Sequence, residues 1–180
     1  MIYGDSLSAG YGLPQGTGWV SLLKKQLKTQ LSVNHVVNAS ISGETTHGGL
    51  NRIEQVLKRY RPNIVIIELG ANDGLRGRPI KSIRENLEAI VKACKQNKAS
   101  ILLVGIRLPP NYGATYTQRF STMYHHIAKR HELNLVPFLL AGFGDKPEYF
   151  QEDRLHPNKY AQEKMLANVW KVLNKMIKSN

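Results

Sequence analysis

Short apolar runs alternate with amphipathic stretches from one end of this chain to the other. The runs "NIVIIEL" at 63–69 and "ILLVGI" at 101–106 are continuous and rich in β-branched residues, which is typical of strands covered on both faces. Between such runs, apolar residues recur at helical spacing. This alternation predicts an α/β fold of three layers, α/β/α, around a parallel sheet. The five expected strands lie at 1–3, 33–38, 63–69, 101–106 and 133–138.

A chain of 180 residues is long enough for one domain with a sizeable core and too short for two comfortable ones. Hydrophobic residues make up 42% and charged residues 21%, and no apolar run approaches the roughly 18 residues of a membrane span. The single cysteine, Cys94, excludes an internal disulfide and a multi-cysteine zinc site. Without repeats or linkers, the chain is predicted to be one domain over residues 1–180.

The formal net charge of +12 favours contact with anionic surfaces, either lipid or nucleic acid. A solvated basic surface is the simpler interpretation. Nucleic acid is not expected as a partner, because the chain has no arginine-rich arm and no nucleic-acid-binding motif. A transient contact with an anionic lipid surface stays open.

Polar clusters follow four of the expected strands. They lie at 4–7, 38–46, 70–74 and 152–158. Ligands of parallel sheets bind at the carboxyl ends of the strands, so these clusters are expected to meet at one edge. Each cluster alone is ordinary turn chemistry, and only their joint position suggests a site.

Ser6 and His156 are the candidate nucleophile and base. Asp153 precedes His156 by three residues, so one turn can bring its carboxylate to a ring nitrogen and leave the other nitrogen to accept a proton. An aspartate-capped turn before the last helix is the alternative. Asp5 and Asp73 are interpreted as structural residues that hold loop amides. No histidine pair has the spacing of a zinc motif, so no metal is expected.

A serine attack on an ester also needs donors for the negative oxygen that forms. Gly43 lets a backbone N–H approach a ligand closely, and Asn72 offers a side-chain amide between two glycines. The Ser6 N–H completes a set of three candidate donors. Turn chemistry explains each residue singly.

These residues resemble the SGNH hydrolases, a branch of the GDSL esterases and lipases, over essentially the whole chain. The closest resemblance is to the bacterial thioesterase I, lysophospholipase L1 and arylesterase subgroup. The four blocks occur in the family's order: Gly4-Asp5-Ser6-Leu7, Gly43, Gly70-Ala71-Asn72-Asp73 and Asp153-x-x-His156. The serine is not in the G-x-S-x-G elbow of α/β-hydrolases.

The resemblance implies a mainly five-stranded parallel sheet and a triad of Ser6, His156 and Asp153. It implies an oxyanion hole of Ser6, Gly43 and Asn72, no cofactor, and a monomer. The implied substrates are acyl esters, thioesters and lysophospholipids, with the loops 74–79 and 109–116 along the acyl groove. A carbohydrate acetylesterase with the same triad and a non-catalytic lipid- or anion-binding module are the alternatives.

Only Met1, Ile2 and Tyr3 precede the first glycine, too few for a well-paired central strand. The first strand is therefore expected to be frayed, or the sequence to lack its original N-terminus. Because the subgroup commonly begins with a secretory signal, the resemblance implies a periplasmic or secreted protein.

Overall fold

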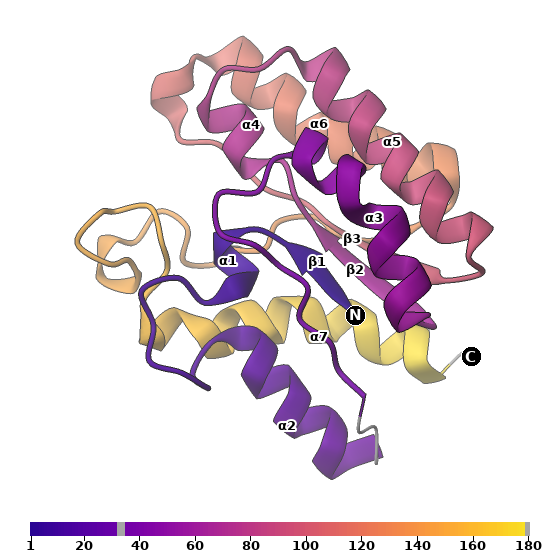
Figure 1. Ribbon diagram of the computed structural model, residues 1–180. Helices are drawn as coiled ribbons and strands as arrows, with labels where there is room; N and C mark the ends of the chain where they lie inside the picture. The colour runs from indigo at the N-terminus through magenta and orange to yellow at the C-terminus, as the bar shows by residue number, and fades with distance from the viewer. Residues whose placement is uncertain (32–34, 179–180) are drawn as a thin grey trace.

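Four parallel strands form the central sheet of the computed structural model, which describes residues 1–31 and 35–178 (Figure 1). Their spatial order, β1-β2-β3-β4, follows the chain. The register pairs Tyr3 with Ile67, and Ile67 with Leu103. The strands are β1 (Ile2–Gly4), β2 (Ile64–Glu68), β3 (Ser100–Val104) and β4 (Asn134–Val136).

The prediction of a fifth strand at 33–38 is wrong for the part of it that the structure describes. Residues 33 and 34 lie outside the described ranges, and the rest contributes one isolated parallel bridge between Ile2 and Asn38. Beyond Asn38 the chain stays beside β1 through hydrogen bonds from Ala39 N to Ile2 O and from Ile41 N to Gly4 O, but it forms no further bridge. The edge that it meets is only the three residues of β1.

The first strand is short but not frayed. Ile2 and Tyr3 are 1% and 0% exposed, and β1 pairs in parallel with β2 along its whole length. On the other side, the Ile2 N–H donates to Val37 O and its carbonyl accepts from Ala39 N. Backbone hydrogen bonds to neighbouring segments on both sides therefore hold β1 in place although it has only three residues.

Helices cover both faces of the sheet, as the alternation predicts. In Figure 1, α3, α5 and α6 lie above the sheet, and α2 and α7 lie below it. The long helices are α2 (Trp19–Leu31), α3 (Thr46–Tyr60), α5 (Ile80–Gln96), α6 (Ala114–His131) and α7 (Gln162–Lys178). Shorter pieces are α1 (Ser6–Ala9), α4 (Ala71–Leu75) and the 3₁₀ turns η1 (Pro110–Tyr112), η2 (Pro147–Tyr149) and η3 (Lys159–Ala161).

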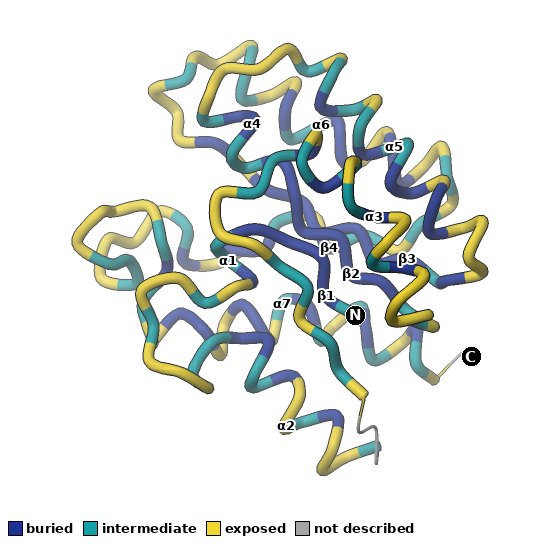
Figure 2. Tube along the Cα trace, in the orientation of Figure 1, coloured by how far each residue is buried: buried dark blue, intermediate teal, exposed yellow. Residues whose placement is uncertain are grey.

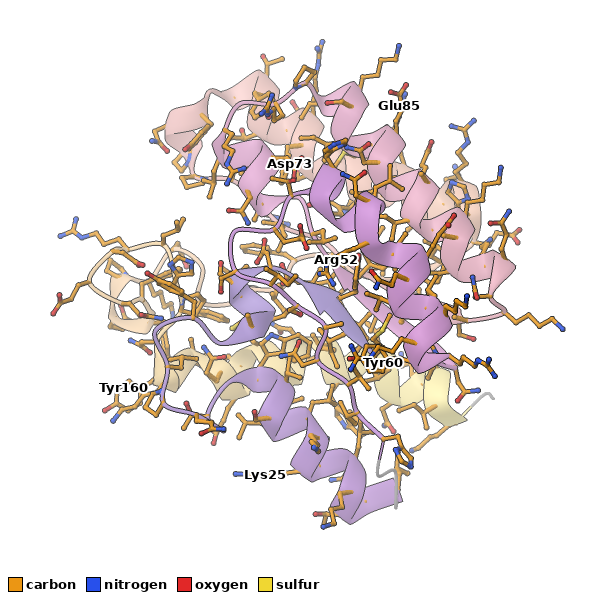
Figure 3. All side chains as sticks on the ribbon, viewed as in Figure 1. Lys25, Arg52, Tyr60, Asp73, Glu85 and Tyr160 are labelled. Atoms are coloured by element: carbon orange, nitrogen blue, oxygen red, sulfur yellow. The ribbon has the colours of Figure 1, made fainter. Side chains whose placement is uncertain are left out.

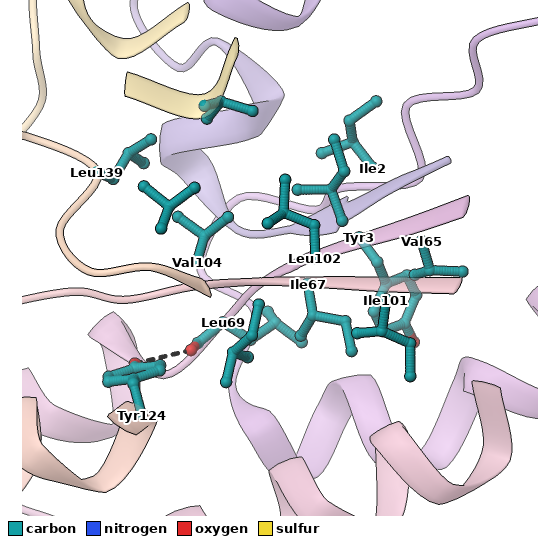
Figure 4. Packing of buried hydrophobic residues seen from close by; sticks show 14 of the residues in the cluster. Ile2, Tyr3, Val65, Ile67, Leu69, Ile101, Leu102, Val104, Tyr124 and Leu139 are labelled. Atoms are coloured by element: carbon teal, nitrogen blue, oxygen red, sulfur yellow. Dashed lines mark hydrogen bonds between the residues drawn. The ribbon is translucent and has the colours of Figure 1, made fainter. Parts of the chain in front are cut away.

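The apolar stripe of each helix packs on the apolar strands. In α5 the predicted stripe is buried at Ile83, Leu87, Ile90, Val91 and Cys94, and its first member, Ile80, is half-buried (Figure 2). Full burial of a leucine or isoleucine side chain stabilises the fold by about 1.5–3 kcal/mol. The hydroxyl of Tyr124 stays satisfied within this core by donating to Leu69 O (Figure 4).

The chain path makes β1 the switch point of the sheet. After β1 the chain returns at Asn38 on one side of the strand. It then forms α3 and enters β2 on the other side of β1. Crevices that bind ligands form at such points, beyond the carboxyl ends of the strands. Ser6 lies there. No helix in the described ranges is both long and apolar enough to cross a membrane.

Candidate active site

The turn after β1 presents Ser6 at the start of a helix. Asp5 caps α1 by accepting from Leu7 N at 3.0 Å, and the αL conformation of Gly10 ends the helix after one turn. The side chain of Asn38 donates to Ser8 O and ties the turn to the neighbouring bridge. Ser6 is thereby held on a short, doubly anchored helix rather than on a free loop.

Two buried carboxyl groups lie beneath this turn. Glu68 is 0% exposed, and its Oε2 accepts from the Ser8 hydroxyl at 2.7 Å and from Asp5 N at 3.4 Å. Burial and the charge of Asp5 raise the pKa of Glu68 well above its usual value. Burial also raises the pKa of Asp5 to about 6, against the lowering effects of the Leu7 N–H and His156. Burial therefore favours the neutral form of Glu68, whereas Asp5, with a pKa of about 6, is mostly ionised at pH 7.

A second turn presents His156. Asp153 Oδ1 accepts from the backbone N–H groups of Leu155 and His156, both at 2.9 Å, and its Oδ2 lies 2.7 Å from His156 Nδ1. Desolvation raises the pKa of Asp153, but these hydrogen bonds outweigh it and hold the pKa below its usual value. A proton on Nδ1 pairs with the carboxylate and leaves the Nε2 lone pair free.

The two turns meet although 150 residues separate them in the chain. His156 Nε2 lies 2.9 Å from Ser6 Oγ, so the chain of contacts from Asp153 through His156 to Ser6 is unbroken. The structure thus brings together the three residues that the sequence singled out as candidate nucleophile, base and acid.

A glutamine that sequence reasoning missed joins the two turns. Gln151 Nε2 donates to Tyr11 O at 2.9 Å and to Pro157 O, while its backbone N–H donates to His156 O. The ring of Tyr11 also lies against the imidazole of His156, with 4.5 Å between centroids. No local motif marks Tyr11 or Gln151, because both contacts depend on distant parts of the chain.

The candidate oxyanion donors line the same opening. Ser6, Gly43 and Asn72 all face one cleft. Gly43 has a φ of 79° and open space where a side chain would stand, so its backbone conformation, not packing, calls for glycine. Asn72 Nδ2 donates to Glu44 O at 3.0 Å and to Asp5 Oδ2 at 3.2 Å, which fixes the amide in place.

Asp5 and Asp73 hold loop amides, as predicted. Asp5 accepts from Leu7 N and from Asn72. Asp73 accepts from the backbone N–H and the hydroxyl of Thr46, each at 2.8 Å, and so fixes the start of α3 against α4 (Figure 3).

A largely apolar cleft of about 950 Å³ extends from Ser6 and His156. Of the two loops expected along it, 74–79 contributes Leu75, and 109–116 contributes Pro109 and Pro110. A further part of the apolar wall comes from two segments that sequence reasoning missed. They contribute Ile106, Leu108, Phe138, Leu140 and Ala141. The run of apolar residues just after β4 is the only sequence signal for this wall.

In the described part of the chain, no three His, Cys, Asp or Glu side chains gather as metal ligands would. Cys94 is buried in α5, and burial raises the pKa of its thiol to about 12. Its role is packing.

Comparison with known proteins decides the family. The model of the GDSL-like lipase/acylhydrolase family matches residues 2–164. The chain belongs to this family. The enzyme is therefore an acyl hydrolase, and the likeness to its relatives extends over nearly all of its length.

Three curated relatives illustrate that likeness. The enzyme is 43% identical to Esterase TesA of Pseudomonas aeruginosa, over 98% of this chain and 88% of that protein. It is 44% identical to an arylesterase of Vibrio mimicus, over 90% and 81%. It is 43% identical to thioesterase 1/protease 1/lysophospholipase L1 of Escherichia coli K12, over 90% and 76%.

Solved structures agree with the fold. A crystal structure of TesA superposes with a TM-score of 0.94 at 44% identity and covers 97% of both chains. The esterase EstA of Pseudoalteromonas, solved with monoethylphosphonate as inhibitor, gives 0.93 at 41% identity, over 98% and 97%. The enzyme shares with both the arrangement of the whole chain.

Proposed function

We propose that this enzyme hydrolyses acyl esters and thioesters through an acyl-enzyme intermediate on Ser6. The observation that carries the proposal is the run of contacts at 2.7 Å and 2.9 Å from Asp153 through His156 to Ser6, at the mouth of an apolar cleft. Nucleophile, base and orienting acid at hydrogen-bond distance are what serine acyl transfer requires.

In the first step, Ser6 Oγ attacks the acyl carbonyl while His156 Nε2 takes its proton. The imidazolium, stabilised by Asp153, then gives that proton to the leaving alcohol or thiol as the carbonyl–heteroatom bond breaks. A water molecule repeats the sequence on the acyl-enzyme, releases a carboxylic acid and returns the proton to Ser6.

The tetrahedral oxyanion would be held by the N–H groups of Ser6 and Gly43 and by the amide of Asn72. In the resting site both protons of Asn72 Nδ2 are engaged, by Glu44 O and by Asp5. The contact to Asp5 is the longer one, at 3.2 Å. In this proposal Asn72 gives up its hydrogen bond to Asp5 and donates to the oxyanion instead. Its hydrogen bond to Glu44 O is kept and orients the amide.

The shape of the cleft favours a longer acyl chain over acetyl. A volume of about 950 Å³ with leucine, isoleucine, proline and phenylalanine along its wall suits an extended hydrocarbon. An acetylesterase for carbohydrates would gain little from that wall. Relatives named esterase, arylesterase and thioesterase/lysophospholipase support esters, thioesters and lysophospholipids as the substrate class.

We propose further, from the sequence, that the enzyme is a monomer in the periplasm or outside the cell. We also propose that it makes transient contact with anionic lipid surfaces. The net charge of +12 and the exposed Tyr11 and Leu155, which line the cleft, support the lipid contact. Co-sedimentation with vesicles of anionic and of zwitterionic lipid tests it, and equal binding to both would contradict it.

The test of the proposed function is Ser6→Ala. The variant should lose ester and thioester hydrolysis by about 10⁴-fold or more and lose labelling by a fluorophosphonate. Its thermal unfolding should stay close to that of the parent. The panel runs from acetyl to palmitoyl esters with aryl, alkyl and thiol leaving groups, and Ser121→Ala on α6 is the matched control. Full activity or full labelling of Ser6→Ala would end the proposal.

A further inference from the structure

Positive charge is in excess along the cleft. Arg107, Lys146 and Arg154 line it, and no carboxylate of the described residues forms an ion pair with any of the three. The acids that line the same cleft are Asp5, which is buried, and Asp145. Cations without an ion-pair partner beside an apolar wall are expected to bind an anionic group of a ligand.

Arg154 stands out among these three by its backbone. Its φ of 55° places it in the left-handed region, which costs a residue other than glycine about 1 kcal/mol or more. The other such residues are Arg61, Lys98 and Glu132, which lie just after helices, where this conformation is common. Arg154 instead lies within the turn that carries His156.

The cause of that conformation is the turn itself. Asp153 Oδ1 accepts from both Leu155 N and His156 N, and Arg154 N donates back to Gln151 O. These bonds fold the chain sharply at residue 154. Glycine would suit this position better on backbone grounds alone, so an arginine whose side chain lines the cleft suggests a role for the guanidinium.

The place of Arg154 indicates which part of a substrate it meets. His156, two residues later, hands its proton to the leaving group in the proposed reaction. Arg107 differs, because its guanidinium packs over the Phe138 ring at 4.9 Å and so lies against the apolar wall. Lys146 comes from the loop after β4, whose residues also line the cleft.

We propose that Arg154, with Lys146, forms a subsite for a phosphate group in the leaving group of the substrate. The inference rests on the proposed esterase function and adds the determinant of leaving-group preference. Arginine suits the role, because its planar fork donates two hydrogen bonds to one phosphate. Lysophospholipids and coenzyme A thioesters both carry such a group, and the test separates these two sources.

The experiment compares pairs of substrates that share one acyl chain. Lysophosphatidic acid is paired with the monoacylglycerol, and the acyl-coenzyme A with the acyl ethyl thioester. For each pair, the ratio of kcat/KM with phosphate to that without it is measured. In Arg154→Gln the ratio should fall about tenfold in at least one pair, mainly through KM, and Arg154→Lys should restore part of it.

The matched control is Lys159→Gln, which removes the same charge from an exposed lysine that does not line the cleft. It should leave both ratios unchanged. A fall in one pair alone supports the subsite and identifies its source of phosphate. Unchanged ratios in both pairs for Arg154→Gln, or an equal fall in Lys159→Gln, would overturn the proposal. A parent enzyme that hydrolyses none of the four substrates would instead refute the proposed function itself, and the subsite with it.

Discussion

The two turns that meet at the site are built in opposite ways. The Ser6 turn lies on the core, where Asp5 and Ser8 are 0% and 2% exposed and Glu68 supports them from below. The His156 turn lies at the surface, where the Asp153 side chain is 40% exposed. The nucleophile is thus held mainly by the buried core, whereas the histidine is held mainly by hydrogen bonds within its own turn and by contacts with Tyr11.

The difference also separates the carboxyl groups of the site by charge state. Burial raises the pKa of Glu68 well above its usual value, so the acid beneath Ser8 resists ionisation. Backbone N–H groups lower the pKa of Asp153, so the acid beside His156 stays ionised. A negative charge is therefore favoured on Asp153, where it can stabilise an imidazolium, and disfavoured on Glu68 beneath the Ser6 turn.

The largest effect is expected from Asp153→Asn. The amide oxygen can still accept from Leu155 N and His156 N, but the charge beside Nδ1 is lost. We expect kcat to fall by about 10²–10⁴-fold and the free energy of unfolding to change by less than about 0.5 kcal/mol. Steady-state kinetics and urea unfolding measure the two quantities.

Asp145→Asn is the control, since Asp145 lines the cleft but has no hydrogen bond to His156. An Asp153→Asn variant that loses stability and activity in parallel would favour the alternative interpretation of Asp153 as the cap of a turn. Such a result would also remove the contrast between the two turns.

On the buried side, Glu68→Gln should change how stability depends on pH. A carboxyl whose pKa is higher in the folded state keeps its proton after the unfolded chain has released it. The parent therefore loses stability as pH rises above the usual pKa of glutamate, at up to about 1.4 kcal/mol per pH unit. The variant lacks that loss, so its stability relative to the parent, measured by urea unfolding, should increase between about pH 5 and about pH 8.

The matched control here is Glu85→Gln, on the exposed face of α5 (Figure 3). It should follow the parent at every pH. If Glu68→Gln also follows the parent, the carboxyl of Glu68 is ionised in the folded protein and the two turns do not differ in charge state.

The comparison also explains what the sequence could predict. The strands at 63–69 and 101–106 were found to within two residues because both are continuous apolar runs, and periodic stripes located the helices. Ser6, His156 and Asp153 were identifiable because each lies in a polar cluster after a strand. The segment 33–38 has strand composition, but the short edge of β1 allows it only one bridge.

The support beneath the site could not be predicted in the same way. Glu68 reads as one more residue of a buried strand, and only the register of β1 on β2 puts it under Ser8. Gln151 donates to the backbone carbonyl of Tyr11, 140 residues away. Any residue at position 11 would offer that carbonyl, so the sequence does not indicate the contact. Likewise, the cleft wall at 138–141 lies in a loop whose apolar residues follow neither helical nor strand spacing.

The smallest effect expected is a gain, from Arg154→Gly. Glycine adopts a φ of 55° without the cost borne by arginine, so the folded state should be stabilised by about 0.5–1 kcal/mol. Lys98→Gly, at a φ of 60° far from the site, should stabilise the fold by a similar amount without altering preference among leaving groups. Arg154→Gly should gain stability and lose the preference for phosphate. If Arg154→Gly changes neither the stability nor the preference for phosphate, the hydrogen bonds of Asp153 alone shape the exposed turn. Residue 154 then adds nothing to the contrast with the buried turn.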